Sequence, residues 1–210
     1  MTANRFDLVA SEWDTVPDRR NIAQKTAEAI LVENIAQPHM KALDFGSGTG
    51  LLTVLLQRHL REVVALDSSR GMLEQLRTKI EAHQLSNVHT EFLDIEGDTR
   101  NFVAQHKHSF DFIFSSMVLH HIEDTAELFQ LFRKICSDHA VLALADLDKE
   151  DGTFHKDNAE AGVKHFGFDR ARLKEIIQNA GWNDVRFETV HTVQRAESGR
   201  DYPIFLCIAR

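Results

Sequence analysis

Residues 43–50 read Leu-Asp-Phe-Gly-Ser-Gly-Thr-Gly, and this stretch decides the fold of the chain. A short apolar run over 41–45 precedes the glycines, and a helix is predicted over 49–59. Glycine lets a chain turn tightly and lets a ligand approach the backbone, because it has no Cβ. A glycine-rich turn between a strand and a helix lies where open parallel sheets bind ligands. The stretch therefore predicts a ligand-binding turn in an α/β protein.

Three other interpretations of the glycines are less well supported. A dinucleotide-binding fingerprint needs Gly-x-Gly-x-x-Gly, but here the third glycine comes one residue early and Leu51 takes its place. A phosphate-binding loop needs a lysine after its last glycine, and none is near Gly50. A plain tight turn remains open, although three alternate glycines weaken helix and strand without a packing gain.

Strands and helices alternate along the chain on both sides of this turn. Apolar or β-branched runs predict strands over 41–45, 62–67, 88–93, 110–114 and 139–146. Helices are predicted over 21–37, 49–59, 69–83, 98–106 and 124–136, and the third of these starts after Ser68 or Ser69 as its N-cap. This alternation is typical of a parallel sheet that helices cover on both faces.

The C-terminal part of the chain changes character. A helix predicted over 169–180 stops at Gly181, and glycine commonly follows the end of a helix. Strands are predicted over 184–193 and 203–209 with only a loop between them. Two strands joined in this way should pair antiparallel.

Composition and charge restrict the class of protein. The chain has 210 residues, is 43% hydrophobic and 27% charged, and carries a formal charge of -8, as expected of a soluble globular protein. Its longest basic cluster is the pair Arg19-Arg20, which argues against nucleic acid or an anionic membrane as the main partner. No stretch has the pattern of a signal peptide or the length of a membrane span, so we expect a cytoplasmic protein. Cys136 and Cys207 lie among apolar residues and are expected to be buried and reduced.

The stretch 43–50 resembles the first motif of class I S-adenosylmethionine-dependent methyltransferases. Later stretches resemble the small-molecule branch of that family, the methyltransferase type 11/12 or ubiquinone-biosynthesis-like group. The resemblance implies a doubly wound, Rossmann-like α/β sheet of seven strands in the order 3-2-1-4-5-7-6, with strand 7 antiparallel. It also implies S-adenosylmethionine as the cofactor and S-adenosylhomocysteine as the product.

The resemblance assigns roles at the ends of the first two strands. In the family, the glycine loop passes beneath the amino-acid part of the cofactor, and the acid before it helps to hold the methionine ammonium directly or through water. These positions are Gly46, Ser47, Gly48 and Gly50 for the loop, and Asp44 for the acid. Asp67 ends the second strand, where an acid accepts hydrogen bonds from the ribose hydroxyls, with Ser68 beside it. An Asp that only caps the next helix is the alternative.

The third strand end would bind adenine. In the family an acid here faces the adenine amino group, and Asp94 has this position, with Leu93 and Ile95 as apolar neighbours. Met72 is placed to touch the other face of the ring, and its interpretation as ordinary core is about equally good.

The fourth strand ends in a stretch that resembles the family's fourth motif, beside the reactive methyl group. Ser115 and Ser116 would contact the cofactor, and His120 or His121 would face the acceptor. A histidine titrates near neutral pH and can accept the acceptor's proton. The alternative is that both histidines only shape the pocket or cap a helix, because many methyl transfers need in-line placement and no base.

One departure from the family lies before the fifth strand. The family often has a Pro-Gly-Gly turn there, whereas residues 136–140 read Cys-Ser-Asp-His-Ala. Because this turn faces away from the cofactor, we expect a structural difference only.

Two segments outside the sheet pattern are candidate lids that exclude water from the site. The first is the N-terminus, with Phe6, Trp13 and Asp14, and the second is 148–168. In the second, Phe154, Phe166 and Phe168 would either line an apolar acceptor pocket or pack the lid onto the domain. Metal ligands could be written from Asp146, Asp148, Asp151 and His155, but their spacing matches no known zinc or calcium site, so no metal is expected.

We therefore expect one domain over residues 1–210. It would consist of an N-terminal helical cap (1–37), a cofactor-binding core (38–146), a lid segment (147–168) and a C-terminal helix with the antiparallel strand pair (169–210). The expected activity is methyl transfer from S-adenosylmethionine to a small-molecule acceptor by direct displacement. A non-catalytic protein that binds S-adenosylmethionine or S-adenosylhomocysteine, and a NAD(P)-binding oxidoreductase, are the alternatives.

Overall fold

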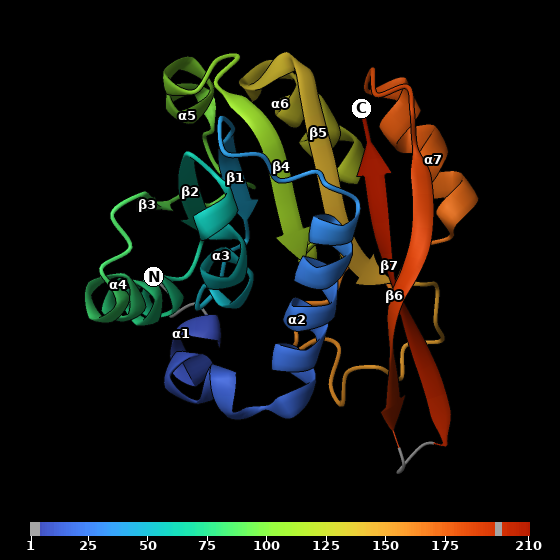
Figure 1. Ribbon diagram of the computed structural model, residues 1–210. Helices are drawn as coiled ribbons and strands as arrows, with labels where there is room; N and C mark the ends of the chain where they lie inside the picture. Colours follow the sequence, from blue (N-terminus) through green and yellow to red (C-terminus); the bar gives the residue numbers. More distant parts are fainter. Residues whose placement is uncertain (1–4, 196–198) are drawn as a thin grey trace.

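The computed structural model describes residues 5–195 and 199–210. They form one sheet of seven strands in the order β3-β2-β1-β4-β5-β7-β6 (Figure 1). The parallel strands are β1 (Lys41–Phe45), β2 (Glu62–Asp67), β3 (Val88–Phe92), β4 (Phe110–Ser116) and β5 (Cys136–Leu147). β7 (Arg200–Ala209) pairs antiparallel with both β5 and β6 (Arg186–Arg195). The predicted fold class, strand order and antiparallel strand 7 are confirmed.

Helices cover both faces of the sheet (Figure 1). One face packs against α2 (Pro17–Val32), α3 (Leu51–Leu56) and α4 (Arg70–His83), and the other against α5 (Arg100–Gln105), α6 (Thr125–Ile135) and α7 (Arg170–Asn179). Within β1, Leu43 and Phe45 join the apolar cluster of the second face, whereas Ala42 joins that of the first. Because both faces of the sheet are buried at its centre, β1, β2 and β4 are mostly apolar, as in other parallel sheets, whereas the edge strands β3 and β6 carry many polar residues.

A segment before α2 lies against α4 (Figure 1). This N-terminal segment, residues 5–15, comprises α1 (Arg5–Val9) and the 3₁₀ helix η1 (Ala10–Thr15). The Asp7 carboxylate accepts a hydrogen bond from Ser69 Oγ at 2.6 Å. The Asp14 carboxylate accepts one from Thr49 Oγ1 at 2.6 Å and pairs with Lys79 Nζ at 2.6 Å. The segment is thus held at the start of α4 and at the glycine-rich turn.

Several element bounds differ from those expected. The first long helix begins at Pro17 rather than at residue 21, because proline is favoured in the first helical turn, and it ends at Val32 rather than at 37. α4 has Ser69 as its N-cap, with the Met72 N–H donating to Ser69 Oγ at 3.1 Å. The first half of the expected helix 49–59 is α3, and its second half is the 3₁₀ helix η2 (Gln57–His59).

The C-terminal half follows the expected pattern more closely. α6 runs directly into β5 at Cys136, so the family's Pro-Gly-Gly turn has no counterpart here. Gly181 follows α7 with φ +93°, the left-handed conformation that ends many helices. Cys136 and Cys207 are buried and unpaired as expected, and burial raises the pKa of each thiol to about 12. In the described part of the chain, no helix combines the length and apolar character needed to span a membrane.

Candidate active site

A cavity of about 840 Å³ lies where β1, β2 and β4 end. Phe45, Asp67 and Ser116 line it from these strand ends, while the N-terminal segment and the loop between β5 and α7, residues 148–169, contribute the rest of the wall. Its volume lies in the upper part of the range of about 300–1,000 Å³ that is usual for small-molecule sites. The cavity is therefore large enough for a nucleoside cofactor together with a small acceptor.

Most of the predicted cofactor residues line this cavity. They are Asp44, Gly46, Ser47, Gly48, Asp67, Ser68, Met72, Leu93, Asp94, Ile95 and Ser116. Gly50 and Ser115 are not among the lining residues. Ser115 is 1% exposed and donates a hydrogen bond to the Phe45 carbonyl at 2.6 Å, so it ties β4 to the end of β1.

The structure favours glycine at different positions of the turn for different reasons. A Cβ on Gly50, whose φ is +80°, would lie 2.3 Å from Cδ1 of Leu76, a side chain that is fully buried. A Cβ on Gly46 would lie 2.5 Å from Cγ2 of Val118. A Cβ on Gly48 would meet no atom within 4 Å. Gly46 and Gly50 thus allow close packing beneath the turn, whereas Gly48 presents its backbone to open space.

Two carboxyl groups meet the turn at the cofactor end of the cavity. Burial raises the pKa of Asp44 to about 7, with the nearby Asp67 adding to the effect and the hydrogen bond from Thr53 Oγ1 opposing it. Burial also raises the pKa of Asp67, against hydrogen bonds from the Gly48 N–H at 2.7 Å and the Ser69 N–H at 2.8 Å. Two acids whose ionised forms are costly in isolation suit a cationic ligand.

The Met72 side chain is buried and also reaches the cavity. It is 2% exposed, as a core residue would be, and it lines the cavity together with Leu93, Asp94 and Ile95. Ser69, rather than Ser68, caps the helix that follows Asp67, which leaves Ser68 on the cavity wall.

His120 lies at the other end of the cavity, on the 3₁₀ helix η3 (Leu119–His121). Its Nδ1 is 2.7 Å from Oδ1 of Asp146, which is fully buried in β5. Burial alone would raise the pKa of Asp146, but His120 and the Leu147 N–H hold it below its ordinary value. This contact uses Nδ1 of the ring and leaves Nε2 for other partners.

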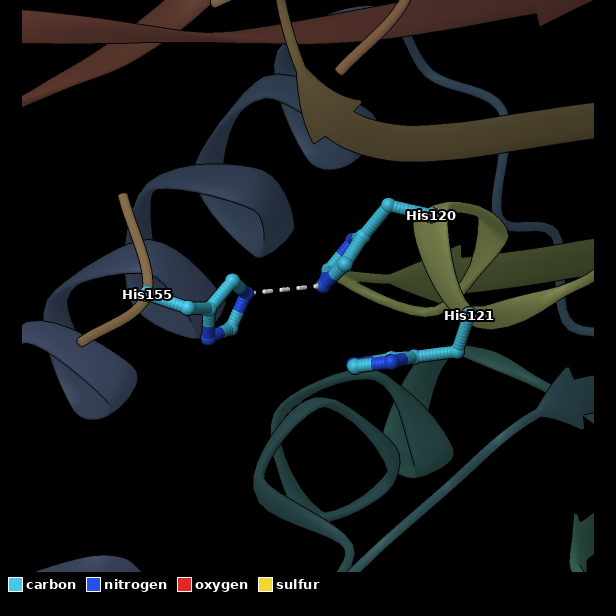
Figure 2. A group of neighbouring side chains, drawn as sticks. All are labelled: His120, His121 and His155. Carbon is cyan, nitrogen blue, oxygen red and sulfur yellow. Dashed lines mark hydrogen bonds between the residues drawn. The ribbon is translucent and has the colours of Figure 1, made fainter. Parts of the chain in front are cut away.

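Two further histidines lie beside His120 (Figure 2). His121 Nδ1 is 3.1 Å from the Gly162 carbonyl oxygen, and His155 Nε2 is 3.3 Å from His120 Nε2. Burial, followed by the proximity of His120, lowers the pKa of His121 to about 3 and that of His155 to about 4. His121 and His155 are therefore neutral at pH 7.

Cationic side chains also line the cavity, although the whole chain carries a net negative charge. They are Arg5, Arg19, Lys156, Lys164 and Arg195, and the charges of Arg5 and Arg195 act on His155. The Arg19 guanidinium stacks over the Trp13 ring at 3.5 Å, and burial lowers the pKa of both Arg5 and Arg19. Such a lining favours a ligand that carries a negative charge.

The aromatic and acidic residues of the loop 148–169 separate into different roles. Phe154 is buried and lines the cavity, whereas Phe168 packs against Phe205 at 6.5 Å and Phe166 is 48% exposed. The acids that were considered as metal ligands with His155 form ion pairs instead. Asp148 pairs with Arg170 at 2.7 Å, and Asp151 pairs with Arg200.

Sequence reasoning missed that Asp146 and His155 both contact His120. His155 is 35 residues from His120, in a loop without regular structure, so no periodicity connects the two. Asp146 stood out in the sequence as an acid at the end of the fifth predicted strand and as a member of the candidate set of metal ligands that also contained His155. Because strand ends of a parallel sheet share one edge, that position was the available signal for its place in the site.

Comparisons with known proteins agree with this geometry. A family model described as a methyltransferase domain matches residues 18–187. An uncharacterized methyltransferase of Schizosaccharomyces pombe is 29% identical over 159 residues, which cover 70% of this chain and 54% of that protein. The chain thus spans about half the length of this curated relative.

Solved structures show the same fold at low sequence identity. An S-adenosylmethionine-dependent methyltransferase from Aquifex aeolicus has a TM-score of 0.69 at 19% identity, over 97% of each chain. Phosphoethanolamine N-methyltransferase 2 of Haemonchus contortus, in complex with S-adenosyl-L-methionine, has a TM-score of 0.68 at 17% identity, over 87% of this chain and 51% of that one.

Proposed function

We infer that this chain, which belongs to the methyltransferase domain family, transfers a methyl group from S-adenosylmethionine to a small-molecule acceptor by direct displacement. One observation carries the inference. A single cavity joins a glycine-rich turn with two buried acids at one end to histidines and cations at the other. The first end suits the cofactor and the second suits an acceptor.

S-adenosylmethionine is the cofactor, and the residues at the turn fit it. Burial raises the pKa values of Asp44 and Asp67, so a nearby cation would stabilise their ionised forms. The cofactor carries two cationic groups, an ammonium and a sulfonium. Gly48 leaves open space where a side chain would intrude. Asp44 would hold the ammonium, Asp67 the ribose, and Asp94 with its apolar neighbours the adenine. When bound, the cofactor supplies an electrophilic methyl group on sulfur.

The acceptor end supports a small molecule with an anionic group. Arg5, Arg19 and Arg195 line it, and their charges would recognise a carboxylate or phosphate. The Haemonchus structure is of an enzyme named for phosphoethanolamine, a small molecule of this charge class. The N-terminal segment and Phe154 enclose this end, so that water is excluded when the acceptor binds.

His120 is the residue that activates the acceptor in this proposal. Asp146 fixes the ring so that Nε2 presents a lone pair at the acceptor end of the cavity. The loop backbone steadies the same residue, because the Lys164 N–H donates to the His120 carbonyl at 2.8 Å. Fixed placement of the acceptor and of the group that activates it is itself a large part of catalysis.

Calorimetric titration with S-adenosylhomocysteine tests the cofactor site. We expect wild-type protein to bind, and Asp67→Ala to weaken binding by about 1–3 kcal/mol, the usual cost of losing a charged hydrogen-bond partner. Asp98→Ala, which removes an exposed acid outside the cavity, is the matched control and should bind as wild type does. Absence of binding by well-folded wild-type protein would contradict the proposal.

A further inference from the structure

We propose that His120, His121 and His155 together bind one divalent transition-metal ion, with a fourth coordination position open to the acceptor (Figure 2). These three side chains form the histidine cluster. The role of the bound ion in activating the acceptor rests on the proposed function.

The positions of the ring nitrogens support a single shared ion. One nitrogen from each ring lies within 4.8 Å of the others, and the Nε2 atoms of His120 and His155 are 3.3 Å apart. Two nitrogens bound to Zn²⁺ at about 2.0–2.1 Å with a tetrahedral angle are themselves about 3.3 Å apart. His120 and His155 thus already have the spacing of two ligands, and a ring nitrogen of His121 lies within 4.8 Å of both.

The outer hydrogen bonds of the cluster are those of metal-binding histidines. A ligating histidine usually donates its other ring N–H to a carboxylate or to a backbone carbonyl, which fixes the ring and its tautomer. His120 has such a bond to Asp146 at 2.7 Å, and His121 has one to the Gly162 carbonyl at 3.1 Å. Both bonds use Nδ1 and leave Nε2 as the ligand atom.

Burial and hydrogen bonding also hold the central ligand of the cluster in place. The His120 and Asp146 side chains are 1% and 0% exposed, and the 2.7 Å contact between Nδ1 and Oδ1 fixes the His120 ring. Nε2 of His120 lies 3.3 Å from Nε2 of His155, and both residues line the cavity.

The charges around the cluster point to both an ion class and an acceptor class. Imidazole ligands without thiolate or hard oxygen suit Zn²⁺, Fe²⁺, Ni²⁺ or Cu²⁺ rather than Mg²⁺ or Ca²⁺. The Asp146 carboxylate offsets part of the ion's charge, whereas Arg5 and Arg195 act against it at His155. An anionic acceptor bound at the open position would balance these cations.

Three protein ligands with one open position are the arrangement of catalytic rather than structural zinc sites. An acceptor hydroxyl or thiol at that position would lose its proton to solvent at a lower pH than in water, because the ion stabilises the resulting anion. The electron pair left on the oxygen or sulfur then forms the bond to the transferred methyl carbon, as the bond from that carbon to the sulfonium sulfur breaks. His120 would activate the acceptor through the ion.

Metal titration of the full chain tests the site. Protein freed of metal by a chelator is titrated with Zn²⁺ by calorimetry and with Co²⁺ by visible absorption. We expect one equivalent of each, and Co²⁺ bands of low-symmetry coordination. His155→Ala, a change in the loop 148–169, should weaken Zn²⁺ binding at least about 100-fold, and Asp146→Asn about 10–100-fold through the orientation of His120.

Two controls make the result decisive. His83→Ala, at the exposed end of α4, should leave Zn²⁺ binding unchanged. His155→Ala should still bind S-adenosylhomocysteine, because His155 lies at the acceptor end, and this shows that the variant is folded.

The outcomes separate the two proposals. If wild-type protein binds S-adenosylhomocysteine but no Zn²⁺ or Co²⁺, or if His155→Ala binds Zn²⁺ as wild type does, the metal site is wrong and the proposed function remains. If Zn²⁺ binds at the cluster but S-adenosylhomocysteine does not bind, the metal site stands and the proposed function fails.

Discussion

At the scale of single residues, Asp44 links cofactor binding to pH. Its pKa is raised to about 7 mainly by burial, so a substantial share of the free protein carries a neutral Asp44 at neutral pH. A bound ammonium group favours the ionised carboxylate and lowers this pKa again. Binding therefore releases a proton from the fraction of molecules that carry one.

We expect the affinity for S-adenosylmethionine to rise with pH through about 7 and to level off above it. Below the raised pKa, the affinity should fall by at most about tenfold per pH unit, because one proton is displaced on binding. Calorimetry in buffers of different ionisation enthalpy measures that proton. Asp44→Asn should bind more weakly and lose the pH dependence near 7, and wild-type binding that is independent of pH from about 6 to 8 would contradict the assignment.

At the scale of elements, the start of α4 connects three parts of the site. Ser69 caps the helix through the Met72 N–H, donates to Asp7 in the N-terminal segment, and its own N–H donates to Asp67. One short stretch thus fixes the cofactor acid, the helix that carries Met72, and the segment above them.

We predict that Ser69→Ala lowers the free energy of unfolding by about 1 kcal/mol, the typical effect of removing an N-cap side chain. It should also weaken S-adenosylhomocysteine binding, because Asp67 and Met72 both depend on this first turn. Asp169→Ala removes the equivalent cap of α7, where the Arg172 N–H donates to Asp169 at 2.9 Å. It should cost similar stability in thermal or urea unfolding and leave binding unchanged. Equal binding by both variants would contradict a functional role for the α4 cap.

The sheet and the cofactor end could be predicted from sequence because their signals are local. Each parallel strand is a short apolar run, and Asp44, Asp67 and Asp94 follow such runs at positions that a parallel sheet brings to one edge. Two predicted cofactor residues, Gly50 and Ser115, do not line the cavity, because side-chain packing rather than strand order decides their positions. Gly50 lies against Leu76 beneath the turn, and Ser115 alternates to the buried side of β4.

The acceptor end could not be predicted in the same way. It is built from the N-terminal segment and the loop 148–169, which lie far apart in the sequence and were expected only as candidate lids. Neither segment has a strong apolar period, and the contact between His120 and His155 spans 35 positions. The arginines that line the cavity are far apart in the sequence of an acidic chain, so no basic run predicts that they come together.

At the scale of the whole molecule, charge is divided unevenly. The chain is acidic overall, yet its cavity is lined both by acids such as Asp44, Asp67 and Asp94 and by the cations Arg5, Arg19 and Arg195. In the proposed function, a cationic cofactor would be drawn to the acids and an anionic acceptor to the arginines.

The N-terminal segment also has a consequence for the timing of turnover. It is held over the glycine turn at two points, Asp7 at Ser69 and Asp14 at Thr49 and Lys79. We predict that Asp14→Ala speeds S-adenosylhomocysteine dissociation several-fold in stopped-flow fluorescence of Trp13, whereas Glu12→Ala, an exposed residue of the same segment, does not. A dissociation rate that is equal in wild type and Asp14→Ala would contradict this. If the prediction holds, the time for which S-adenosylhomocysteine stays bound is set by how often residues 5–15 move away from the glycine-rich turn, so product release depends on a segment that takes no part in the chemistry.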